Sequence, residues 1–362
     1  MRAKAETSDA TSFNAKSTAK SAVKPAVNHA AKSVDRESAV APVVAVLLIL
    51  AVLMTIISLY SAIYVPALKE QSEIEHLAGV EDTFLLFSSD IESAILTKSE
   101  GTVTRNVELG GGSVVLSPQK SGGIMEVKDD TPTWLCQIYK SNERIPENLM
   151  SQSTLVNFSY ESVGNFWMDN GYLWDYGIVS LKTPYSSLTP IQYTTYDAAA
   201  EDIKKNGGIF KSFYDMDYSS TVYFVKDPGT GDLTGEVWEI CKDITITGVT
   251  FKKGAEDYIS GSGHATLKMD AKMEYRTANA TELVFYINPD LFPPRTDNEI
   301  LNSTGSVLTE SIGLKLNEFK SKNFKNAKNY NYDKENHHFE VAFDPAIPVR
   351  LTVRNLILTI SV

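Results

Sequence analysis

The sequence predicts a mostly β protein that begins with one long helix, whose first half is long and apolar enough to span a membrane. An uncharged, apolar segment runs from Ser38 to Leu68. Apolar residues then recur at helical spacing as far as Ala94. From Gly101 onward, short stretches of alternating apolar and polar residues are separated by glycine-rich turns. In this chain of 362 residues, the patterns predict a helix followed by an antiparallel, sandwich-like β domain.

Residues 1–37 are expected to form a disordered, basic leader on the cytoplasmic side of a membrane. They are rich in Ala, Ser, Lys and Thr, a composition that cannot bury enough apolar surface to fold. Seven basic and four acidic residues give the leader a net charge of +3. Because the whole chain carries −11, the remainder carries −14.

Residues 38–65 are predicted to be a transmembrane helix. A bilayer core needs roughly 20 apolar helical residues, and this segment, whose centre reads VVAVLLILAVLMTII, supplies them. It is longer than the apolar part of a cleaved signal peptide and lies deeper in the chain. A buried core helix of this length would carry a polar face. Tyr60 and Tyr64 suit the membrane interface.

The charges on either side of the apolar segment predict its orientation. Basic flanks stay in the cytoplasm, so the acidic bulk is expected outside the cell. The lipid bilayer is the expected partner of the apolar segment. An acidic exterior does not favour binding of nucleic acid.

Residues 66–99 are predicted to continue the helix as an amphipathic stalk, which Pro66 kinks at its start. The apolar positions follow one another at spacings of 3 and 4: Leu77, Val80, Phe84, Phe87, Ile91 and Ala94. This seam has two interpretations. It packs on the β domain of its own chain, or it packs against neighbouring copies in an assembly.

Residues 100–362 are predicted to form the β-rich extracellular domain. The clearest strand is 267–275, where apolar side chains alternate with charged ones, as a half-buried antiparallel strand requires. Residues 349–354 repeat the pattern. Two helices interrupt the strands. One covers 197–205 and is closed by Gly207 and Gly208, and the other includes residues 308–319.

The sequence offers few residues for chemistry. Cys136 and Cys241 both lie in the exported part, where an oxidising environment permits a disulfide; the alternative is two buried thiols. Three sequons mark possible glycosylation at Asn157, Asn279 and Asn302, although chance alone predicts about as many. No catalytic, cofactor or metal motif was found, so neither an enzyme nor a cofactor is expected.

The segment SAVAPVVAVLL, residues 38–48, resembles the N-terminus of archaeal type IV pilin-like proteins. Val40, Pro42 and Val43 fit the family pattern of a basic leader, a small residue, Val, Ser, Pro, Val and a long apolar helix, with Ala41 in place of Ser. The resemblance implies cleavage of the leader at Ser38 or Ala39. It also implies a non-enzymatic surface protein, anchored by its helix or associated with other pilin-like subunits through it.

Two other functions remain open at this point. The first is an anchored adhesin or ligand-binding module that uses exposed aromatic residues such as Trp167, Tyr172 and Trp174. The second, less favoured, is an extracellular hydrolase.

Overall fold

The computed structural model of the protein describes residues 36–111, 113–114, 120–129, 135–140, 147–150, 155–184, 188–288, 298–333 and 338–362. For residues 36–41, 135–140, 147–150, 286–288, 298–306 and 309 it describes the backbone only. The chain divides into two compact units, Met1–Ser58 and Leu59–Val362, and each is described by itself.

The N-terminal helix is continuous in its backbone from Arg36 to Thr97. It consists of α1 (Arg36–Leu59), a π-helical turn η1 (Tyr60–Tyr64) and α2 (Val65–Thr97). The π turn has a local cause. Pro66 has no N–H to donate to the preceding turn, and just before it the Val65 N–H reaches back five residues to the Tyr60 carbonyl. The helix therefore adjusts ahead of the proline and continues, as the sequence predicted.

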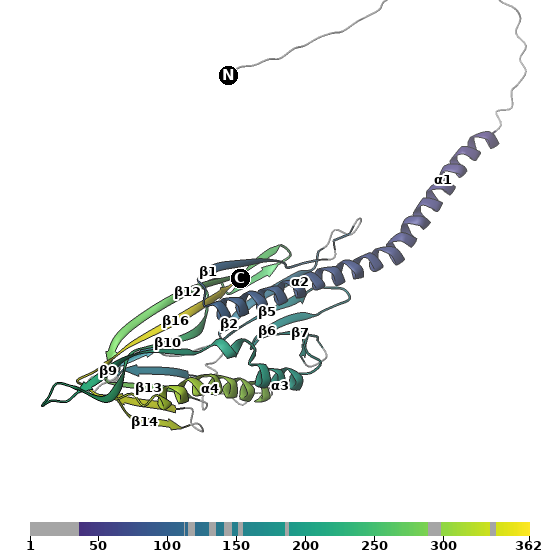
Figure 1. Ribbon diagram of the computed structural model, residues 1–362. Helices are drawn as coiled ribbons and strands as arrows, with labels where there is room; N and C mark the ends of the chain where they lie inside the picture. Colours follow the sequence, from purple (N-terminus) through teal and green to yellow (C-terminus); the bar gives the residue numbers. More distant parts are fainter. Residues whose placement is uncertain are drawn as a thin grey trace, which may run out of the picture. The chain divides into compact units, whose positions relative to one another are not determined.

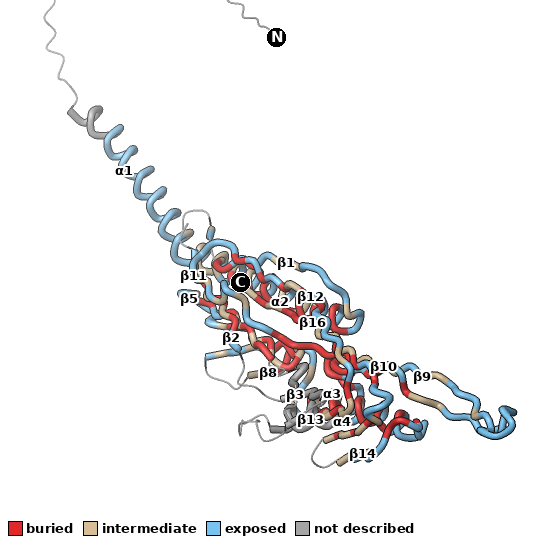
Figure 2. The backbone as a smooth tube through the Cα atoms, turned by 90° about the vertical axis from the view of Figure 1, so that its left-hand side faces the viewer, coloured by how far each residue is buried: buried red, intermediate tan, exposed pale blue. Residues whose placement is uncertain are grey.

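The first half of this helix is exposed from Pro42 to Leu59, the part whose side chains the structure describes. Among the described residues it contains the one helix long and apolar enough to cross a membrane, and no residue of its most apolar stretch is buried. Figure 2 shows α1 as exposed throughout its described part. A membrane-spanning helix near the N-terminus is thus consistent with both sequence and structure.

The seam of α2 packs on the β strands of the same chain. Its six apolar side chains are all buried: Leu77, Val80, Phe84, Phe87, Ile91 and Ala94. The helix contacts β1 (Gly101–Glu108) on one side and β6 (Gly171–Asp175) and β7 (Ile178–Lys182) on the other. Figure 1 shows α2 lying along these strands. The first interpretation of the seam, packing on its own domain, is confirmed.

The described strands belong to three sheets. The first has the spatial order β1, β12 (His264–Ala280), β16 (Val349–Ser361), β10 (Leu233–Lys253) and β9 (Asp215–Lys226). The second has the order β11 (Tyr258–Gly261), β2 (Gly122–Asp129), β5 (Val156–Val163), β6, β7 and β8 (Thr189–Pro190). The third has the order β14 (Ala327–Asp333), β15 (His338–Phe343), β13 (Glu282–Asn288), β3 (Leu135–Lys140) and β4 (Glu147–Met150).

The expectation of a purely antiparallel domain is wrong at one strand pair. β10 and β16 run parallel, from Asp243 opposite Arg350 to Lys253 opposite Ile360, whereas the other described pairs are antiparallel. The physical reason is burial. Residues 246–251 of β10 are buried on both faces, which is typical of parallel strands in the middle of a sheet and leaves no polar alternation to indicate direction.

A chain of aromatic rings joins the helix to the first two sheets. Phe84 and Phe87 both contact Phe158 of β5, at ring-centroid distances of 5.2 and 5.4 Å. Phe158 stacks on Trp174 of β6 at 5.0 Å. Trp174 in turn contacts Phe251 of β10 at 5.9 Å. Since these rings are fully buried, they form the centre of the core.

Both predicted helical insertions are confirmed. α3 (Tyr196–Asn206) begins at Thr195, whose side chain accepts a hydrogen bond from the Ala198 N–H, and ends at Gly207 with φ 87°. A short 3-10 helix, η2 (Gly208–Ser212), follows. The second insertion is α4 (Asn298–Ser321), which contacts α3, η2 and β9.

Candidate functional site

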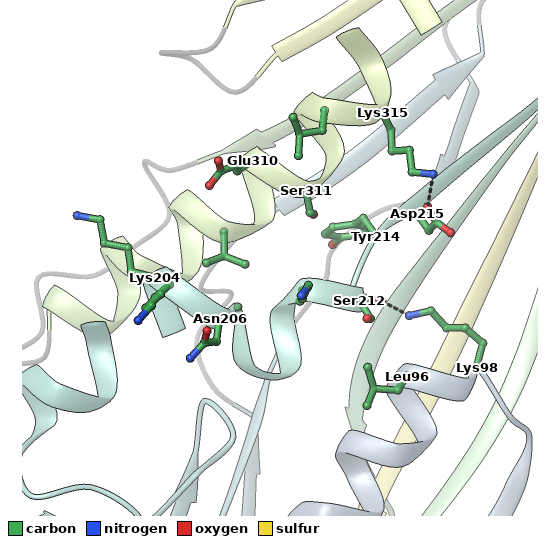
Figure 3. A pocket seen from close by; sticks show the side chains of 15 residues that line it. Leu96, Lys98, Lys204, Asn206, Ser212, Tyr214, Asp215, Glu310, Ser311 and Lys315 are labelled. Carbon is green, nitrogen blue, oxygen red and sulfur yellow. Dashed lines mark hydrogen bonds and ion pairs between the residues drawn. The ribbon is translucent and has the colours of Figure 1, made fainter. Parts of the chain in front are cut away.

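A cavity of about 550 Å³ opens where the C-terminal end of α2, the α3–η2 segment and α4 meet (Figure 3). Its lining contains five lysines and two carboxylates. The lysines are Lys98, Lys204, Lys205, Lys211 and Lys315, and the carboxylates are Asp215 and Glu310. The cavity is therefore basic, although the chain that surrounds it is acidic.

Two of these lysines contact the short segment from Ser212 to Asp215. Lys98 ends α2 in the left-handed conformation, with φ 50°. Its Nζ donates to the Ser212 carbonyl, while the Lys315 Nζ lies 3.8 Å from Asp215 Oδ1. Figure 3 shows the two side chains arriving from different helices on either side of this segment. The C-terminal end of α2 and the body of α4 thus place two cations beside a single carboxylate.

Burial lowers the pKa of the Lys98 ammonium to about 8, and the charge of Asp215 opposes part of this shift. With this pKa the side chain is still mostly protonated at pH 7, and a charge that is partly desolvated gains more from pairing with an added anion than a fully hydrated one does. Of the remaining lysines, Lys204, Lys205 and Lys211 are exposed and Lys315 is half-buried. Lys204 and Lys205 also lie in the last turn of α3, where they complement the negative end of the helix dipole.

The walls of the cavity combine this charge with apolar surface from Leu96, Val307 and Leu314, and with the buried ring of Tyr214. Such a lining suits a small organic anion that has an apolar part. Sequence reasoning missed the site because its residues come from five separate elements, α2, α3, η2, β9 and α4. The available signal was the group of lysines at 204, 205 and 211 in an otherwise acidic domain.

The predicted disulfide stays a prediction. Cys241 is buried on β10, and burial raises the pKa of its thiol to about 12. Asn326, which is 1% exposed, accepts from the Cys241 N–H and donates to the Cys241 carbonyl, both at 2.9 Å. Cys136 lies on β3, and its side chain is outside the described residues.

The three sequons occupy different surroundings. Asn157 lies within β5 and is half-buried, whereas Asn279 is exposed near the end of β12. Asn302 lies in α4, not in an extended loop, and its side chain is outside the described residues. The possible cleavage residues Ser38 and Ala39 lie in the first turn of α1, for which only the backbone is described. Glycosylation and cleavage remain predictions.

The aromatic residues named for an adhesin do not form one surface. Tyr172 and Trp174 are buried in the core, where the Tyr172 hydroxyl donates to Glu81 at 3.1 Å and the Trp174 Nε1–H donates to Ser88 at 2.9 Å. Trp167 alone of the three is exposed. The interpretation of Tyr172 and Trp174 as ligand contacts is therefore wrong: they fasten α2 to the second sheet.

Within the described part of the chain, no group of three or more His, Cys, Asp or Glu side chains is placed to hold a metal ion. No protein-family model matches the chain, and no curated protein or solved structure was found to be similar to it.

Proposed function

We propose that the protein is a non-enzymatic surface protein of pilin-like build, anchored in the cell membrane by its N-terminal helix, with the β-rich unit outside the cell. The observation that carries the proposal is the division of one continuous helix. Its first half exposes its apolar side chains, whereas its second half buries an apolar seam in the β domain.

The exposed side chains of α1 are apolar, and their exposure to water would be energetically unfavourable. Large residues from Val43 to Leu59 are between 45% and 65% exposed. A continuous apolar surface of this size marks contact with a membrane or with other protein. The charge of the leader orients the helix with residues 1–37 in the cytoplasm.

A sandwich-like stacking of the first two sheets belongs to the same proposal, and the Trp174–Phe251 ring contact supports it.

Protease accessibility tests the anchored topology. Protease added to intact cells is expected to digest the unit after residue 100 and to spare the basic leader. Digestion of the leader in intact cells, with the β-rich unit protected, would reverse the orientation. Recovery of the full chain in the soluble fraction would contradict anchoring altogether.

The mature N-terminus separates a filament subunit from a permanent anchor. If a prepilin-type peptidase acts on the chain, mass spectrometry of the native protein should find a terminus between Glu37 and Val40. Ala39→Asp should then block processing. A native protein that begins at residue 1 or 2 would rule out the filament and leave the anchored module.

A second function, binding of a small organic anion, is favoured by the basic cavity. Benzene-1,3,5-tricarboxylate is a suitable probe, since it combines an apolar ring with three carboxylates. Lys315→Met should weaken its binding by about tenfold, which corresponds to the loss of one charge-assisted contact. Lys182→Met, at an exposed lysine paired with Glu161 on the second sheet, is the matched control. Equal binding by both variants would contradict this function.

A further inference from the structure

The connection between β5 and β6 presents two large aromatic side chains to solvent. Phe166 is 73% exposed, the highest value among the described aromatic residues, and Trp167 is 49% exposed. Their rings contact each other edge to face at 5.0 Å. Val163, just before them, is also exposed. Together these residues form an apolar tip that folding alone does not explain.

This aromatic tip is held in place by a buried carboxylate on α2. Glu73 is 3% exposed. One of its oxygens accepts from the Phe166 N–H at 2.8 Å, and the other accepts from the Trp167 N–H at 2.9 Å. Burying a carboxylate is costly unless such hydrogen bonds satisfy it. Because both main-chain amides are fixed to the helix, the two rings face outward instead of folding into the core.

The position of Glu73 places the tip close to the apolar segment. Glu73 lies nine residues after Tyr64, which corresponds to about 13 Å of α-helix. The headgroup region covers roughly 5–7 Å of this distance on each side of the bilayer core. The remainder is about the length of an extended aromatic side chain. Tyr64, Glu73 and the tip all belong to the same compact unit, so this spacing does not depend on the placement of α1.

We propose that the aromatic tip of the β5–β6 connection inserts into the headgroup region of the bilayer that α1 spans, and so gives the β-rich unit a second membrane contact. The inference rests on the proposed anchoring by the helix. Tryptophan is enriched at membrane interfaces because its ring is apolar and its N–H can stay hydrated. Phenylalanine and valine add apolar area to the same contact.

A lipid surface fits the tip for a second reason. Lys69 lies four residues before Glu73, and thus on the same helix face one turn closer to the apolar segment. A lysine at that height can pair with lipid phosphates. Exposed Glu70 and Glu75 on neighbouring positions leave no excess of positive charge there. The contact should therefore depend on apolar insertion and persist in uncharged phosphatidylcholine.

Fluorescence quenching by bromine-labelled lipid tests the contact on the full chain. The protein is reconstituted in phosphatidylcholine vesicles with and without brominated acyl chains, and the quenched fraction of tryptophan emission is measured. Trp167→Phe should lower that fraction clearly. The matched control is Trp238→Phe, whose side chain is 40% exposed on β10. Trp238 pairs in register with Tyr223 in the β9–β10 hairpin, which lies away from the start of α2 (Figure 1). Trp238→Phe should not lower the quenched fraction.

The design separates this inference from the anchoring on which it rests. Failure of the protein to float with the vesicles would contradict anchoring. Flotation with the same quenched fraction in wild type and Trp167→Phe would overturn the second contact alone. Shielding of Trp167 from iodide only when copies assemble, with no quenching by lipid, would assign the tip to a subunit contact and also overturn the proposal. Both substitutions are at exposed positions, and unchanged circular dichroism confirms that the variants are folded.

Discussion

Replacing Phe87 by alanine should destabilise the β-rich unit strongly, whereas replacing its neighbour Leu86 should not. Phe87 is fully buried and contacts Phe158, while Leu86 is 52% exposed on the other side of the helix. Truncation of a buried phenylalanine costs about 3–5 kcal/mol, from lost apolar burial and the cavity left behind. A substitution at an exposed position usually changes stability by about 0.5 kcal/mol or less.

Thermal unfolding of the full chain in detergent micelles measures the difference. Near-ultraviolet circular dichroism should be followed, because Trp174 reports on the core and the apolar half of the helix can remain helical in the micelle. For a unit that runs from Leu59 to Val362, an unfolding entropy of about 2.1 cal/mol/K per residue gives about 1.6 °C per kcal/mol, so Phe87→Ala should lower the Tm by about 5 °C or more. Leu86→Ala should shift it by about 2 °C at most.

A similar loss in the two variants would refute the argument, because it would mean that the seam is not the face that the domain buries. A loss for Leu86→Ala alone would point to a partner on the outer face of α2. Unchanged stability in both variants would mean that α2 does not contribute to the core.

Three further predictions concern single side chains. Lys98→Met should raise the free energy of unfolding at pH 7 by about 1–2 kcal/mol after allowance for solvent screening, because burial lowers the pKa of the ammonium to about 8 from 10.5. Between pH 8 and 10.5 the unfolded chain binds one more proton than the folded chain, so the stability of the wild type should recover relative to the variant as the pH rises through this range, which thermal scans measure. Gly79→Ala should stabilise α2 by up to about 1 kcal/mol, because an added Cβ meets no atom within 4 Å. Gly123→Ala should instead destabilise the protein by at least about 1–3 kcal/mol, because its Cβ would lie 2.4 Å from a main-chain oxygen, and the two variants should therefore shift the Tm in opposite directions. Asn326→Ala should cost about 2–4 kcal/mol in urea unfolding, because it leaves both main-chain groups of buried Cys241 without their partner, and a change of about 0.5 kcal/mol or less would show that water replaces it.

The long N-terminal helix could be predicted because its signals are local. Its uncharged run and its apolar spacing of 3 and 4 each depend only on neighbouring residues. The same holds for α3, whose end is marked by Gly207. The spacing could not decide what covers the seam. That depends on Phe158, which is distant in the chain from Phe84 and Phe87.

Strand order and strand direction were harder to predict for the same physical reason. In the sequence of β10, the polar residues Lys242 and Asp243 interrupt the apolar pattern and suggest two strands, 237–241 and 244–251. The structure keeps one strand and absorbs the interruption as a register shift between Cys241 and Asp243. Similarly, the cavity unites Lys98, Ser212 and Lys315 through tertiary packing, to which no sequence window refers.

The burial of the seam restricts how copies of the chain can pack together. Because the seam face of α2 is already covered by its own domain, any helix contacts between copies in the proposed filament would fall mainly on α1. There, Ala51, Thr55 and Ser58 lie on one helix face at spacings of 4 and 3, and small side chains let helices approach closely. If α1 spans the bilayer as proposed, this face would contact lipid, and assembly would exchange lipid contacts for helix contacts without a large gain from the hydrophobic effect. A leader with seven basic residues adds a charge that resists extraction from the membrane. Under the proposed function, removal of that leader would be the step on which a filament depends, whereas a chain that keeps its leader would act as an anchor.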